Sequence, residues 1–205
     1  MRLLRVLALL APLGAAPLAQ AQLLDTGPGN FTTGRPANDG PGQGVAVSTE
    51  TALTQMGFYL GSPNGGNLKF LIFDGTNSVL LFSTIRGIAS TPNGTLALSN
   101  PFTFTLNAGS IYNFGIISDN HLNVSYFAPV IVWSENGLTL VGNNRNYMNY
   151  ASPSPRLDGM ASIALALYGT QAVTVVPEPA SIALLATGLV GVLGVMRRRR
   201  AAATS

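Results

Sequence analysis

The sequence predicts an all-β body that folds as an antiparallel β-sandwich, either jelly-roll-like or immunoglobulin-like. Short runs rich in β-branched and aromatic residues recur through the body, and clusters of Gly, Pro, Asn and Ser separate them. No run of ten residues shows the period of an amphipathic helix. Charged residues make up only 9% of the chain, a composition common in exported β-rich domains.

The first 21 residues are predicted to be a secretory signal peptide. Two arginines stand among the first five residues, and an apolar stretch follows over 6–18. Ala19 and Ala21 then fit the small-x-small cleavage rule, so the mature chain is expected to begin at Gln22. Two prolines interrupt the apolar stretch, which argues against a permanent N-terminal anchor.

The body, 22–176, has the length of one domain with its own core. Its first part, 22–44, is rich in Gly, Pro, Asn and Thr and is expected to be an irregular lead-in, with room for one short strand. Turns are predicted where these residues cluster again, at 62–67, 74–77, 91–94, 107–110 and 135–137. Ten strands are expected around them, at 52–60, 68–74, 78–86, 102–106, 111–118, 123–127, 130–133, 138–141, 161–168 and 171–176.

The net positive charge of the whole chain comes from its terminal segments and not from the body. Of the eleven Lys and Arg residues, six lie in the terminal segments, and the body carries five bases and seven acids, a formal charge of five minus seven, or −2. A basic surface for nucleic acid is therefore not expected. The chain has no cysteine, which excludes disulfides, thiolate metal sites, cysteine nucleophiles and a lipoprotein anchor.

Three features follow the body in order. They are Pro177-Glu178-Pro179, an uncharged apolar run over 180–196, and four consecutive arginines, Arg197, Arg198, Arg199 and Arg200. The seventeen apolar residues would form a helix about 26 Å long, close to the thickness of a bilayer core. The arginines would stop the helix at the cytoplasmic side, and the prolines would hold the preceding segment extended.

This order resembles the PEP-CTERM sorting signal of Gram-negative bacteria. The resemblance covers 177–200 and implies that an exosortase, a membrane protease-transpeptidase, recognises Pro177, Glu178 and Pro179. It also implies export by the Sec machinery, a transient anchor in the inner membrane, and a final place at a cell surface or matrix rich in exopolysaccharide. The alternative is a permanently anchored surface protein whose tail is never cut.

No catalytic residue is predicted, and the body is expected not to be an enzyme. His121 is the only histidine, and it lies in a polar turn without the sequence context of a nucleophile. No metal site or other cofactor is expected, although loop oxygens of Asp74, Asp119, Asn120 and Asp158 leave a structural calcium as an alternative. An exported glycan hydrolase remains the less favoured enzymatic reading, because no pair of acids stands out.

Glycan contact is expected at aromatic residues, because aromatic rings stack on sugar faces. The best candidates are Tyr147 and Tyr150, which lie among amides in a segment, 142–150, that is expected to be a polar loop. Trp133 and Tyr126 are expected to fill the core instead. The sequence therefore predicts a structural or exopolysaccharide-associated binding module at the cell surface.

Overall fold

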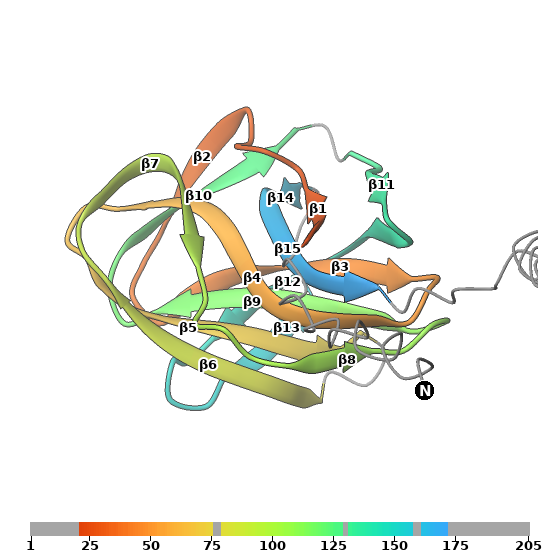
Figure 1. The fold of residues 1–205 in the computed structure, drawn as a ribbon. Helices are drawn as coiled ribbons and strands as arrows, with labels where there is room; N and C mark the ends of the chain where they lie inside the picture. Colours follow the sequence, from red (N-terminus) through yellow and green to blue (C-terminus); the bar gives the residue numbers. More distant parts are fainter. Residues whose placement is uncertain (1–20, 76–78, 129–130, 158–160, 172–205) are drawn as a thin grey trace, which may run out of the picture. The chain divides into compact units, whose positions relative to one another are not determined.

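The computed structural model describes residues 21–75, 79–128, 131–157 and 161–171, all of which lie in the compact unit Met1–Ala172. These residues form fifteen strands arranged in two antiparallel sheets (Figure 1). The all-β prediction is therefore confirmed. The described part of the chain contains no helix that could cross a membrane. The predicted signal peptide, apart from Ala21, and the predicted tail helix lie outside the described residues.

The first sheet has eight strands. Its main path runs β1 (Ala21–Asp25), β15 (Leu165–Gln171), β4 (Thr51–Ser62), β10 (Leu122–Phe127) and β14 (Ser162–Ile163). Off this path, β2 (Phe31–Arg35) pairs with β10, and both β7 (Thr91–Leu98) and β8 (Phe104–Leu106) pair with β4.

The second sheet has seven strands. Its path runs β11 (Ser134–Glu135), β12 (Leu138–Met148), β3 (Asp39–Val47), β9 (Ile111–Ser118), β5 (Gly66–Asp74) and β6 (Leu80–Ile88). The last strand, β13 (Ser154–Leu157), pairs with β12.

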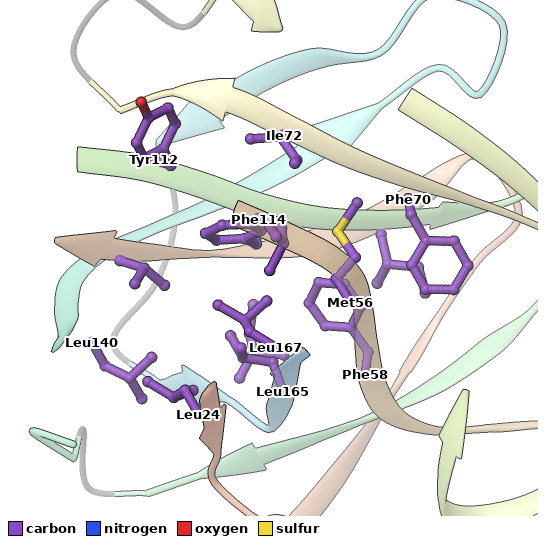
Figure 2. Packing of buried hydrophobic residues seen from close by; sticks show 14 of the residues in the cluster. Leu24, Met56, Phe58, Phe70, Ile72, Tyr112, Phe114, Leu140, Leu165 and Leu167 are labelled. Atoms are coloured by element: carbon purple, nitrogen blue, oxygen red, sulfur yellow. The ribbon is translucent and has the colours of Figure 1, made fainter. Parts of the chain in front are cut away.

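The two sheets share one hydrophobic core, which is the arrangement of a β-sandwich. Alternate residues of each strand point inward, so Phe58 and Leu165 of the first sheet meet Phe70 and Phe114 of the second (Figure 2). All four side chains are fully buried, and Phe58 and Phe70 lie with ring centroids 6.2 Å apart. Burying each such side chain contributes about 1.5–3 kcal/mol, so this core is the main source of stability.

The segment expected to be irregular contains three strands, β1, β2 and β3. β3 lies inside the second sheet, between β12 and β9, despite its glycines and its proline. The glycines are required by close packing, because a Cβ on Gly40 would lie 1.8 Å from the carbonyl oxygen of Ile116. Glycine therefore marks a tight contact between strands here, although its abundance in this segment predicts irregular chain.

Several other strand predictions are also corrected. The turn predicted at 91–94 lies within β7, where Gly94 has φ +78° and the Thr95 hydroxyl donates to the carbonyl of Pro92, 2.8 Å away. These residues bend the strand without ending it. Residues 131–133 are not a strand, and a short strand follows them at β11. β12 continues through the expected polar loop to Met148. β15 includes Gln171, and the rest of the strand predicted at 171–176 lies outside the described residues.

Candidate functional site

The predicted sorting residues are not among those that the structure describes. Pro177, Glu178, Pro179, the arginines at 197–200 and Ala19 all lie outside the described ranges. Ala21 is the exposed first residue of β1 and pairs with Gly169. A cut after Ala21 would remove one residue from β1 and leave Gln22 paired with Tyr168. Signal cleavage at this bond is thus compatible with the fold, and it stays a prediction.

Tyr147 is corrected as a glycan contact, because its side chain is fully buried. Its ring stacks on Phe73 with 4.8 Å between centroids. Gly42 and Gly115, which pair across β3 and β9, lie directly against the other parts of the ring. A Cβ on either glycine would come within 2.3 Å of a ring carbon. The two glycines therefore leave the space that the ring of this core tyrosine occupies. No face of the ring is free to contact a sugar.

Tyr150 lies nearer the surface and packs against the same small cluster. The Lys69 ammonium donates to the backbone oxygen of Tyr150 and lies 4.5 Å from its ring centroid. Burial raises the pKa of the Tyr150 phenol, and the negative charge of Asp119 adds to this effect. Lys69 covers one face of the ring, so glycan contact at Tyr150 stays a prediction that concerns its other face alone.

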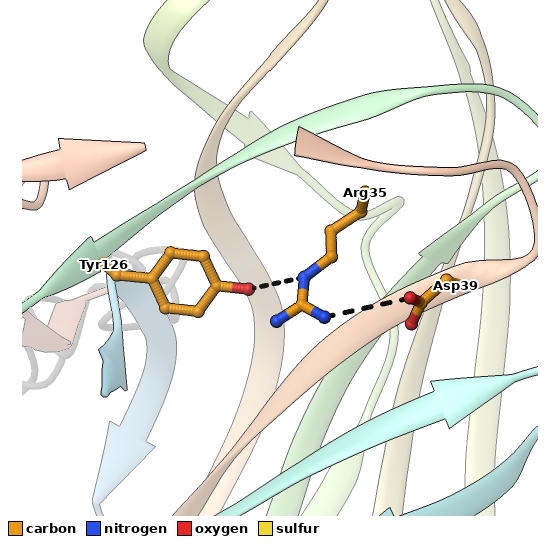
Figure 3. A network of polar contacts seen from close by, with 3 residues as sticks. All are labelled: Arg35, Asp39 and Tyr126. Atoms are coloured by element: carbon orange, nitrogen blue, oxygen red, sulfur yellow. Dashed lines mark hydrogen bonds and ion pairs between the residues drawn. The ribbon is translucent and has the colours of Figure 1, made fainter. Parts of the chain in front are cut away.

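Tyr126 belongs to the core, as expected, and a polar network anchors its hydroxyl (Figure 3). Arg35 Nε donates to this hydroxyl at 3.0 Å, and Arg35 Nη1 lies 3.8 Å from Asp39 Oδ2 (Figure 3). Because Tyr126 and Arg35 belong to the first sheet and Asp39 to the second, the network joins the sheets. Trp133 does not fill the core, because 40% of its surface is exposed.

The polar turn around His121 is exposed, as expected. His121 Nε2 lies 3.2 Å from Asn123 Oδ1, and the Asn123 amide donates to Asn93 at 3.0 Å. Asp119 accepts two hydrogen bonds from Asn67, at 2.8 and 2.7 Å. Within the described ranges, no three His, Cys, Asp or Glu side chains come together. Asp158, one of the residues considered for calcium, lies outside these ranges.

A surface that no motif in the sequence indicates lies on the outer face of the first sheet and is made by Asp25, Tyr59 and Tyr168. The Tyr59 hydroxyl donates to both carboxylate oxygens of Asp25, at 2.9 and 3.1 Å. The backbone N–H of Gly27 donates to Asp25 Oδ1 at 2.8 Å, and Glu135 Oε2 accepts from the backbone N–H of Asp25 at 3.3 Å. We name this the Asp25–Tyr59–Tyr168 surface.

The electrostatics of this surface keep both phenols protonated. Burial raises the pKa of Tyr59 to about 12, assisted by its hydrogen bond to Asp25 and by the negative charge of that carboxylate. Burial also raises the pKa of Tyr168, with a smaller contribution from Asp25. One pattern in the sequence does indicate this surface. In β4 and β15 the two tyrosines alternate with buried Phe58 and Leu167, so they point to the outer face of the sheet.

The structure thus defines an all-β sandwich with an acidic and aromatic outer surface. Residues 175–200 match the PEP-CTERM protein-sorting motif, which confirms the resemblance drawn from the tail. The chain therefore carries the sorting signal of a PEP-CTERM protein, which indicates export and exosortase-dependent sorting to the cell surface, with an exosortase as its processing partner. No curated protein matches the chain.

Proposed function

We propose that this protein is a cell-surface or extracellular-matrix component whose β-sandwich body serves as a structural or exopolysaccharide-associated binding module. The observation that carries the proposal is the sorting motif at 175–200, which begins four residues after β15 ends at Gln171. A cut at Pro177-Glu178-Pro179 would therefore leave every described strand intact. Export would deliver a folded body, and removal of the tail would release it from the inner membrane.

We propose no catalytic role for the body. The only histidine, His121, is oriented by the side-chain amide of Asn123. In a Ser-His-Asp triad a carboxylate stabilises the charged imidazole, whereas the side-chain contact of His121 is with an amide oxygen. The acids Asp119 and Asp25 are each engaged by hydrogen-bond donors of the fold. These contacts support a role in binding or structure.

The tail test uses a bacterial host that has an exosortase. In the triple variant Pro177→Ala, Glu178→Ala, Pro179→Ala, the protein should remain in the inner membrane with its tail intact. Deleting Arg197–Arg200 should instead loosen retention and misplace the cut, because buried arginine costs at least about 2.5 kcal/mol when the helix slides inward. Fractionation and an antibody against the tail follow both variants.

The wild-type chain in the same host without its exosortase is the matched control, and it should behave like the triple variant. If the triple variant is processed and reaches the surface like the wild type, the proposed route is wrong. The permanently anchored alternative predicts that the wild type keeps its tail whether or not the exosortase is present.

A further inference from the structure

The register of three neighbouring strands places the Asp25–Tyr59–Tyr168 surface on one face. Asp25 of β1 pairs with Ala166 of β15, and Ala166 pairs with Gly57 of β4. Tyr59 lies two residues beyond Gly57, where its backbone N–H donates to the carbonyl of Ala164. Side chains two apart along a strand share a face, so Tyr59 lies on the same outer face as Asp25.

The Tyr59 ring must lie nearly flat on the sheet. Its hydroxyl reaches Asp25 two strands away, a separation of about 9.5 Å between strand axes, so the side chain crosses β15. Ala166 of β15 and Ala164, just before this strand, are the residues under this path, and both are fully buried. One ring face therefore rests on the two alanines and the other faces outward.

Tyr168 extends the same face along β15. It is the next outward residue after Ala166, and it is flanked by Gln22 of β1 and Gln55 of β4, which are its register partners. Tyr168 lies four residues along the strand from Ala164, the neighbour of Tyr59, so the two tyrosines are anchored about 13 Å apart. Asp25 lies between them in the register, which makes an elongated surface that suits an extended chain.

We propose that the Asp25–Tyr59–Tyr168 surface binds a neutral polysaccharide chain, an assignment that deepens the binding role proposed above and rests on it. Each tyrosine supplies an apolar ring with a polar end, the combination that accepts the C–H face of a sugar and its hydroxyls together. An ionised carboxylate accepts about four hydrogen bonds, and Tyr59 and Gly27 do not fill that capacity. Sugar hydroxyls would donate to the remaining positions.

The charge of the surface selects a neutral polymer over an acidic one. Glu135 lies against the backbone of Asp25, so two carboxylates stand at the same end of the surface. Among the described residues, no cation forms an ion pair with Asp25, and the pair Arg35–Asp39 lies elsewhere. A polyanion would be repelled here, because like charges at close range in a partly buried place are unfavourable. The raised pKa values of Tyr59 and Tyr168 keep both phenols neutral as well.

The test is affinity electrophoresis of the exported chain through gels that contain hydroxyethylcellulose, an uncharged glucan. Retardation should be strong for the wild type and weak for Tyr168→Ala, with a loss of affinity of about tenfold, as expected for one aromatic stacking contact. Asp25→Asn should also weaken retardation, because it removes the charge of the acceptor. Tyr168→Phe should bind like the wild type, because it keeps the ring.

Tyr150→Ala tests the rival glycan contact, the one predicted at Tyr150, which packs against a separate cluster beside the second sheet. It should leave retardation unchanged. The proposal is overturned if Tyr168→Ala binds like the wild type, if Tyr150→Ala alone abolishes binding, or if no retardation occurs. Stronger retardation by alginate, an acidic polymer, also overturns it.

Tail processing of the same variants separates this proposal from the sorting route. Tyr168→Ala and Asp25→Asn should be processed like the wild type, because neither residue lies in the sorting motif. Normal processing without glucan binding would overturn the binding surface and leave sorting intact. Glucan binding by a chain whose tail is never cut would overturn sorting and support the binding surface.

Discussion

Replacing Tyr147 by Ala should destabilise the fold strongly, because this ring is a core element of the second sheet. The ring is fully buried, stacks on Phe73 and rests on Gly42 and Gly115. Removing a large aromatic side chain from such a place costs about 3–5 kcal/mol, since the two glycines offer no side chains that could fill the cavity. This loss is a large share of the unfolding free energy of a typical domain, which is about 5–15 kcal/mol.

Urea unfolding followed by far-ultraviolet circular dichroism measures this effect. With a slope of about 2 kcal/mol per molar urea, the midpoint of Tyr147→Ala should fall by roughly 2 M. Tyr150→Ala is the control, because it removes a partly exposed ring and a cation–π contact worth about 0.5–1 kcal/mol. Equal midpoints for Tyr147→Ala and the wild type would refute the assignment of this tyrosine to the core.

Three further predictions follow from other parts of the fold. Gly40→Ala should lower the unfolding free energy by about 1–3 kcal/mol or more in thermal unfolding, because its Cβ would meet the Ile116 carbonyl at 1.8 Å. Gly87→Ala, whose nearest contact would be an ordinary 3.5 Å, should be nearly neutral, and equal effects would contradict the packing argument. The pKa of Tyr59 rises from 10.0 to about 12 on folding, so the unfolded chain loses this proton first. The contribution of Tyr59 to stability should therefore be constant below pH 10 and fall as pH rises toward 12, and Tyr59→Phe should reduce that fall in urea midpoints. An unchanged fall would exclude a shifted Tyr59. N-terminal sequencing should find Gln22 first, and a start at Met1 would refute signal cleavage.

Strands with clear alternation could be predicted from the sequence. In β4 and β9, large apolar residues alternate with small or polar ones over most of the strand, whereas β5 is a short apolar run between turn residues. β3 could not be predicted, because its glycines are explained by partners far away in the chain. Gly40 needs to be small only because Ile116 lies against it, and Gly42 only because Tyr147 does.

The candidate binding surface was missed for the same physical reason. Asp25 and Tyr59 are 34 residues apart, and only the pairing of β1 and β4 with β15 brings them together. The amides around Tyr147 predict a loop, although the residue lies in β12 with its ring buried. Local composition predicts whether a segment is polar. Whether one of its side chains is buried against a sheet depends on residues that are distant in the sequence.

The mass of the protein recovered from the cell surface tests the central claim most directly, because it fixes both ends of the mature chain at once. An exported and exosortase-processed protein should begin at Gln22 and lack the apolar and basic segment 180–200, while it keeps every described strand. A surface-recovered mass that still includes 180–200 would contradict exosortase processing and establish the permanently anchored alternative.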